Sequence, residues 1–216
     1  ILSKYPTVTP MYEGQNREAK KTTDSLNLVG PIILLLIYIV IAFTFRSYSQ
    51  PVLLIVMIPF SMIGVIWGHY FHNFAIGILS FLGIIALIGI MVNDGLVLIG
   101  KFNNYLKEGM KFDDALVRAG QSRFRAIFLT SLTTVAGLAP LIFEKSRQAQ
   151  FLIPMAISIA YGIAIATVLT LVMLPLLLSV SNTIKVGVKW LKTGNEITKE
   201  EVERAIIESK FDEDEI

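Results

Sequence analysis

Four long stretches of the chain contain no Asp, Glu, Lys or Arg, and they limit what the chain can fold into. They cover residues 25–45, 47–93, 126–143 and 148–184. A helix needs about 20 mainly apolar residues to cross a hydrocarbon core of roughly 30 Å, so each stretch can supply one or two spans. Only 17% of the residues are charged, against about 25% in a typical soluble domain, and the mean hydropathy is +0.64. These properties predict an all-α membrane protein.

Hydropathy, prolines and charges together predict a bundle of five transmembrane helices. Residues 1–24 are polar, and we expect them to be the end of a water-facing domain that includes a short charged helix. Residues 111–120 are expected to form a short amphipathic helix on the inner membrane surface. Residues 183–216 are expected to form a solvated acidic tail. The five predicted spans cover residues 26–45, 52–71, 76–100, 126–143 and 151–180.

The distribution of Lys and Arg predicts the orientation of these spans. With the N-terminal end outside, the inner segments as far as Lys192 hold ten Lys and Arg residues, and the outer segments hold six. We therefore expect the chain to start on the outer side and to end in the cytoplasm. The last predicted span, at thirty residues, would measure about 45 Å, so it must tilt or protrude from the membrane.

Asn93 and Asp94 interrupt the third predicted span, and Asp94 is the only charged residue between Arg46 and Lys101. A charge at the centre of a membrane helix costs roughly 2.5 to 3.5 kcal/mol on insertion scales. One interpretation is that Asp94 reaches toward the inner headgroups. The other is that Asp94 is a protonatable carboxyl group, because burial disfavours the charged form. Such a group could load and release a proton while the helices rearrange.

Other polar and small residues in the spans have simpler interpretations. Thr130 begins a run of hydroxyl residues, which in membrane helices usually bond back to the backbone or join helices, and a relay role is the alternative. Pairs such as Gly64 and Gly68 predict close helix packing. His69 and His72 share a helix face, yet no third metal ligand is apparent, so no metal site is expected.

Two further features exclude common chemistries. Gly95, Gly100 and Lys101 have the spacing of a phosphate-binding loop, but Phe102 stands where Mg²⁺ coordination needs Ser or Thr. Cysteine is absent, which excludes disulfides and cysteine-based metal sites within the chain. We expect no cofactor, no enzymatic activity and no nucleic-acid partner.

Several sequence segments together resemble a known family. These segments, in order, are FRSYSQP, IPFSMIGVIWGH, GIIALIGIMVND, AGQSRFRAIFLTSLTTVAGLAPL and RQAQFLIPMAISIAYG. They are similar to the C-terminal membrane domain of resistance-nodulation-division (RND) efflux permeases of the hydrophobe and amphiphile type. The resemblance covers about residues 5–180. It implies that the chain is the end of the second periplasmic porter loop followed by the last five of twelve helices.

The resemblance implies a function as well. RND permeases are multi-pass proteins of the bacterial inner membrane that exchange protons for drugs or other amphiphiles, so multidrug resistance is the expected role. They act as homotrimers with a periplasmic adaptor and an outer-membrane channel, surrounded by membrane lipids and joined to the rest of the permease chain. The alternative is a non-transporting RND-like membrane scaffold or lipid-handling protein with the same helices.

The resemblance also assigns roles to four residues. Asn93 takes the position where multidrug members carry Lys, Asp94 the next position, where they carry Asn, and Thr130 the hydroxyl position on the following helix. These three would form the proton relay. Arg123 matches an arginine at the cytoplasmic entry of that helix and would mark the proton entry. In the family, the relay also includes a pair of aspartates on a helix of the first half of the permease. Without the Lys, no fixed cation neutralises that aspartate pair, and Asp94 adds a further carboxylate beside it.

Overall fold

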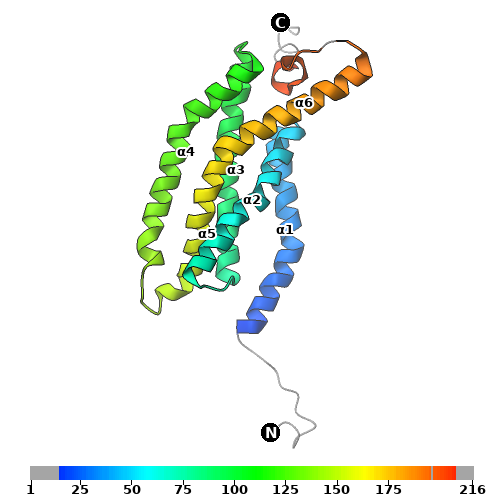
Figure 1. Ribbon diagram of the computed structural model, residues 1–216. Helices are drawn as coiled ribbons and strands as arrows, with labels where there is room; N and C mark the ends of the chain where they lie inside the picture. Colours follow the sequence, from blue (N-terminus) through cyan, green and yellow to red (C-terminus); the bar gives the residue numbers. More distant parts are fainter. Residues whose placement is uncertain (1–14, 196, 208–216) are drawn as a thin grey trace, which may run out of the picture. The chain divides into compact units, whose positions relative to one another are not determined.

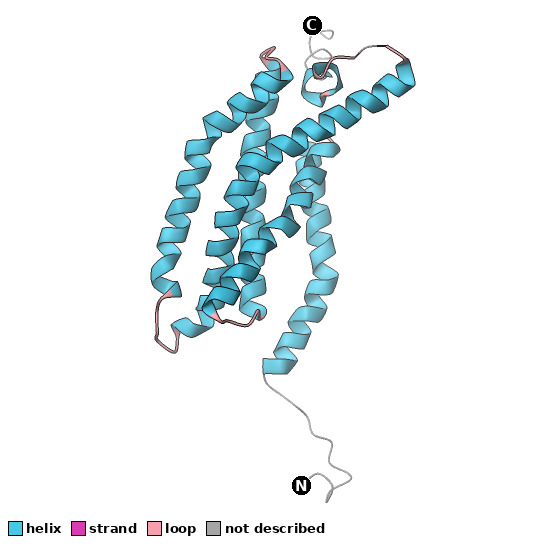
Figure 2. Cartoon of the chain, in the orientation of Figure 1, coloured by secondary structure: helices cyan, strands magenta, loops and turns pink. Residues whose placement is uncertain are grey.

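The computed structural model describes residues 15–195 and 197–207, and the regular elements in these ranges are all helical (Figures 1 and 2). Five segments are long and apolar enough to cross a membrane, which confirms the predicted five-helix membrane bundle. The first fourteen residues of the expected water-facing domain and the acidic end of the tail, residues 208–216, lie outside the described ranges. The helices are α1 (Gln15–Phe45), α2 (Ser49–His72), α3 (Ile78–Lys107), α4 (Phe112–Ile142), α5 (Ala149–Val168) and α6 (Leu174–Thr193).

The chain divides into two compact units, with the boundary inside α1 after Leu36. In the first unit, the segment expected as a separate charged helix is continuous with the first span. Its first seven residues, QNREAKK, are mostly good helix formers, and Pro31, inside α1, is tolerated in a membrane helix. The apolar part of α1 begins at Leu28. In the second unit, the end of α1 contributes the buried Ile41 to the main apolar core.

Helix α5 packs against α2, α3 and α4, so it lies at the centre of the second unit (Figure 1). Small residues permit this packing. A Cβ atom added at Gly64 would collide with the carbonyl oxygen of Tyr161, and one added at Gly162 would collide with the side chain of Leu87. At Gly83 the added atom would lie 2.7 Å from the carbonyl oxygen of Met155. The predicted close packing of glycine-bearing helices is therefore confirmed.

The last span continues beyond the predicted boundary and bends. A π-helical segment, Leu169–Met173, joins α5 to α6, and a proline lies in the first turn of α6. Both features are established causes of helix kinks. Figure 1 shows α6 running away from the axis of α5. This bend agrees with the expectation that a span of this length must tilt or protrude from the membrane.

Residues 111–120 are expected as a separate surface helix; Lys111 precedes α4 instead, and residues 112–120 form its first turns. No proline separates them from the following apolar residues, and the single glycine there, Gly120, is tolerated inside a helix, so the helix continues. The tail also differs from a freely solvated appendage. Glu203 and Ala205 are buried, and a 3-10 turn, Glu200–Val202, places them against the end of the bundle.

Candidate functional site

Asp94 lies near the middle of the 30-residue helix α3. It is half-buried and makes no hydrogen bond or ion pair with any residue of the described ranges. The next residue, Gly95, is buried where α3 meets α2, because an added Cβ would collide with Leu54. The backbone at Asp94 is thus held by a close helix contact, and its carboxylate lies at the edge of that packed face.

Asn93 lies on a different face of α3, because adjacent residues of a helix are rotated by about 100° about its axis. It is exposed, and so are Ala86, Gly89 and Val97, which share its face at helical spacing. An added Cβ at Gly89 would meet nothing within 4 Å. This face of α3 is lined by small and polar side chains and has room for another helix. The amide of Asn93 is available there as both donor and acceptor.

Thr130 is exposed on α4, and its hydroxyl donates a hydrogen bond to the carbonyl oxygen of Ala126 at 2.8 Å. Thr133 and Thr134 bond back to the preceding turn in the same way. Back-bonding, the simpler interpretation of these hydroxyls, is therefore observed. Each hydroxyl keeps a free lone pair, so the relay role of Thr130 stays a prediction.

The hydroxyl group that joins helices is at the next position. Ser131 is buried, donates to the carbonyl oxygen of Ile127 and accepts a hydrogen bond from Thr167 of α5. This pair links α4 to α5 inside the bundle. Polar links of this kind stabilise helix association in membranes by about 0.6 kcal/mol on average.

Arg123 lies in the charged first part of α4, before its apolar residues begin. It is partly buried, and its Nε atom is buried without a hydrogen-bond partner in the described part of the chain. Asn93 and Asp94 are adjacent on α3, while Thr130 and Arg123 lie on α4, which packs against α3. Within residues 15–195 and 197–207, no hydrogen bond or ion pair joins the two pairs. The relay and the proton entry remain sequence-based assignments.

A buried amide pair was not found by sequence reasoning. Gln50, at the start of α2, donates to Asn103, near the end of α3, at 2.9 Å, and Asn103 donates back at 3.1 Å. Both side chains are almost fully buried. Their reciprocal bonds join the two helices at the end of the bundle that carries most of the basic residues. The only available signal was a glutamine beside Pro51 at the predicted helix start.

The two histidines are engaged in hydrogen bonds at the other end of the bundle. Nδ1 of His69 lies 2.9 Å from the carbonyl oxygen of Val65, so Nδ1 carries the proton and Nε2 accepts from Ser80 at 2.8 Å. His72 lies 3.0 Å from the hydroxyl of Tyr161. No group of three His, Cys, Asp or Glu residues that could hold a metal ion occurs in the described residues.

Taken together, the described residues form a tightly packed bundle of membrane-spanning helices, and the unpartnered carboxylate of Asp94 lies near the middle of one of them. A membrane carboxylate of this kind typically serves ion or proton movement. The comparisons with known proteins narrow this class. The profile of the AcrB/AcrD/AcrF family matches residues 3–181. The chain therefore belongs to the AcrB/AcrD/AcrF family of RND permeases, which are transporters.

The match to each individual relative covers only a small part of that relative's length. The cobalt-zinc-cadmium resistance protein CzcA of Cupriavidus metallidurans is 29% identical over 164 residues, which are 76% of this chain and 15% of CzcA. The swarming motility protein SwrC of Bacillus subtilis is 27% identical over 77% of this chain and 16% of SwrC. The multidrug resistance protein MdtC of Erwinia tasmaniensis is 26% identical over 72% of this chain and 15% of MdtC.

A solved structure agrees with the fold. The crystal structure of a heavy metal efflux pump aligns with a TM-score of 0.70 and 24% identity, over 84% of this chain and 18% of the pump. The chain thus spans about one sixth of the length of the relatives it matches.

Proposed function

We propose that the chain belongs to a proton-coupled secondary exporter and that Asp94 is the principal titratable group of its membrane domain. The observation that carries the proposal is the placement of Asp94 near the middle of α3, half-buried and without a charge partner in the described residues. Asn93 and Thr130 are proposed as its hydrogen-bonding relay partners. Arg123 is proposed to mark the cytoplasmic proton entry.

Proton binding at Asp94 can drive a conformational change because the protonated and the charged carboxyl group are stable in different surroundings. The charged form is costly among apolar side chains unless a partner or water reaches it, whereas the neutral form is tolerated there. Each form therefore favours a different helix arrangement, and a proton gradient shifts the equilibrium between the two. The small residues beside Asn93 leave α3 a face along which another helix can move.

We further propose that the protein is a multi-pass protein of the bacterial inner membrane with the end of this chain in the cytoplasm. The basic residues support this orientation. The segments that we expect on the cytoplasmic side carry most of them, and these segments lie together at one end of the second unit. The hydrogen bond between Gln50 and Asn103 and the ion pair between Asp113 and Lys199 join these segments. Positively charged loops remain on the cytoplasmic side of a membrane.

For the substrate, we propose drugs or other amphiphiles, exported by a homotrimer that works with a periplasmic adaptor and an outer-membrane channel. The name of MdtC, a multidrug resistance protein, supports this class. Metal cations are the second candidate, because CzcA is named for cobalt, zinc and cadmium resistance. A deletion strain separates the two: sensitivity to dyes and detergents supports amphiphiles, and sensitivity to cobalt, zinc or cadmium salts supports metals.

Replacement of Asp94 by Asn in the full-length protein tests the coupling. We expect export driven by a pH gradient to fall to the level of cells that lack the protein, with expression unchanged, because Asn cannot exchange a proton. Glu108→Gln is the matched control, since Glu108 is an exposed carboxylate at the end of the same helix. Unchanged export by the Asp94 variant would remove Asp94 from the mechanism.

A second measurement separates a transporter from a membrane scaffold. The full-length protein is reconstituted in liposomes that contain a pH-sensitive dye, and candidate substrates are added. An exporter moves protons when its substrate is present. A scaffold would show no substrate-induced proton flux, and that result, across both substrate classes, would contradict the proposed function.

A further inference from the structure

We propose that residues 182–193, the second half of α6, form an amphipathic anchor that lies in the membrane–water interface and binds anionic lipid headgroups through Lys189 and Lys192. The family profile ends at residue 181, so the family assigns nothing to this segment. The proposal does not depend on proton coupling. It rests on the length of the last span, on an exposed apolar stripe and on a lysine face beside that stripe.

The length of the last span places this segment outside the hydrocarbon core. The helical run from Ala149 to Thr193 has 45 residues. At 1.5 Å per residue it would measure about 68 Å, more than twice the roughly 30 Å of the core. The π-helical segment and the bend turn α6 away from α5 before the run ends (Figure 1). The second half of α6 therefore begins near one membrane surface.

An apolar stripe continues along α6 from the span into this segment. Its members follow one another at intervals of four or three residues and are all exposed, with Ile184 at 61% and Leu191 at 77% exposed. No residue that the structure describes buries any of these side chains. An exposed stripe of this kind, continuous with a membrane span, fits the acyl boundary of a bilayer. The stripe consists of Leu176, Val180, Ile184, Val188 and Leu191.

Three lysines lie beside the stripe on an adjacent face, Lys185, Lys189 and Lys192. Lys185 is used within the protein, because its ammonium group lies 3.2 Å from the carboxylate of Glu203. Lys189 donates to the main-chain carbonyl oxygen of Glu201, at 3.2 Å, and forms no ion pair within the residues that the structure describes. Lys192 makes no ion pair with any residue that the structure describes.

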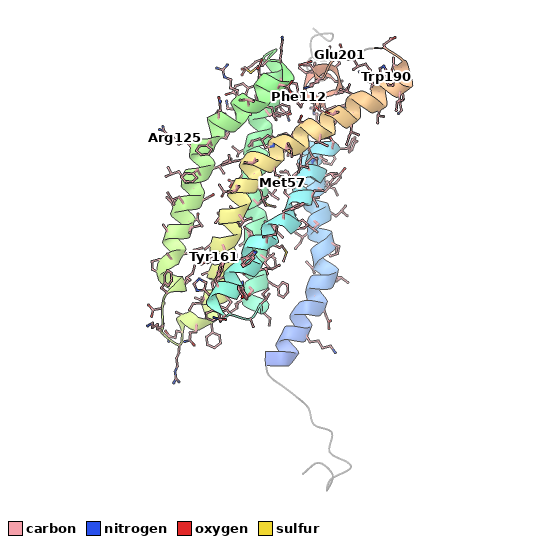
Figure 3. All side chains as sticks on the ribbon, viewed as in Figure 1. Met57, Phe112, Arg125, Tyr161, Trp190 and Glu201 are labelled. Carbon is pink, nitrogen blue, oxygen red and sulfur yellow. The ribbon has the colours of Figure 1, made fainter. Side chains whose placement is uncertain are left out.

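Two positive charges thus remain beside an exposed apolar stripe, and the surface complementary to both is an anionic bilayer. Lysines near a membrane surface attract anionic headgroups, and their aliphatic stems can lie along the apolar boundary. Trp190, exposed on the flank opposite the lysines and near the free end of α6, adds a side chain that favours this interface (Figure 3). The arrangement is that of an interfacial helix held by charge and by apolar contact together.

Site-directed spin labelling tests the proposal, because the chain contains no cysteine to interfere. In the full-length protein, freed of cysteines elsewhere, Leu191→Cys and Thr193→Cys each receive a nitroxide. Leu191 lies on the apolar stripe, and Thr193 lies on the opposite face of the same helical turn. The protein is reconstituted in liposomes with and without phosphatidylglycerol, and collisions with oxygen and with a water-soluble nickel chelate are measured.

We expect the label at Leu191 to collide several-fold more with oxygen and less with the nickel chelate than the label at Thr193. Adding Lys189→Gln and Lys192→Gln should reduce this difference in phosphatidylglycerol liposomes and leave it unchanged in purely zwitterionic ones. Two results would overturn the proposal. One is equal access of the chelate to both sites, and the other is a Leu191 label shielded from both reagents, which would mean that protein covers the stripe.

Discussion

At the scale of single residues, the amide pair of Gln50 and Asn103 makes a sharp prediction. Replacing Gln50 by Leu removes two hydrogen bonds and leaves the buried amide of Asn103 without a partner. We expect the free energy of unfolding to fall by about 1 to 2 kcal/mol, because an unsatisfied buried polar group costs this much. Unfolding by sodium dodecyl sulfate in mixed micelles measures the change.

The double variant Gln50→Leu with Asn103→Leu provides the control. Both polar groups are then absent, so no unsatisfied amide remains and the stability should return toward that of the unmodified protein. A double variant that is as unstable as the sum of both single variants would show that the two amides contribute separately. The pair would then not be a unit that joins α2 to α3.

The contrast between Asp94 and this amide pair shows what a sequence reveals at this scale. A carboxylate in an apolar run is conspicuous on its own, so Asp94 and its neighbour Asn93 could be selected without a structure. The pairing of Gln50 with Asn103 depends on which helix ends meet, and these residues are 53 positions apart. Amides near span ends are common, so no local pattern distinguishes a pair that is buried from one that faces water.

At the scale of helices, the glycines where α2 crosses α5 predict a graded effect of added volume. We expect Gly64→Ala to lower the free energy of unfolding by about 1 to 3 kcal/mol, since the new methyl group meets the main-chain carbonyl of Tyr161, which cannot rotate away. Gly120→Ala is the control, because an added Cβ there meets nothing within 4 Å. It should be neutral or slightly stabilising.

Thermal unfolding of both variants in detergent measures the difference. Equal midpoints for the Gly64 and Gly120 variants would show that α2 and α5 are not in close contact. The glycine spacing was visible in the sequence, so close packing could be predicted, whereas the helices that share it could not. That assignment needs the crossing geometry, which depends on all five spans at once.

Helix existence was easier to predict than helix limits, and the reason is physical. Apolar runs identify the spans because lipid requires them, but beyond the hydrocarbon core nothing in the apolar pattern ends a helix. Helix α3 accordingly continues to Lys107 through a segment that contains no proline, and α4 begins at Phe112 without a break before its span. The extension leaves Asp94 nearer the middle of its helix than the predicted span suggested.

At the scale of the whole second unit, the tail joins segments that are far apart in the sequence. Glu200 accepts a hydrogen bond from the backbone N–H of Phe112, at the start of α4, and Lys199 forms an ion pair with Asp113 at 2.7 Å. Glu203, buried beside α6, accepts hydrogen bonds from Asn182 and Lys185. Residues 199–203 therefore connect the first turn of α4 to α6, and Figure 3 shows Phe112 and Glu201 at the same end of the bundle.

Replacing Glu203 by Gln tests whether this connection acts as a unit. A hydrogen bond to a charged group contributes about 1.5 to 3 kcal/mol, so its loss should speed amide hydrogen exchange in residues 199–207 by about tenfold or more. The first turn of α4 should exchange faster as well, since Glu200 and Lys199 hold it through the same tail. Glu201→Gln is the control, because Glu201 is exposed and contacts Lys189 only through its main-chain oxygen. If Glu203→Gln changed exchange in the tail alone, then α4 would keep its first turn without the tail, and the tail would contact α4 without stabilising it.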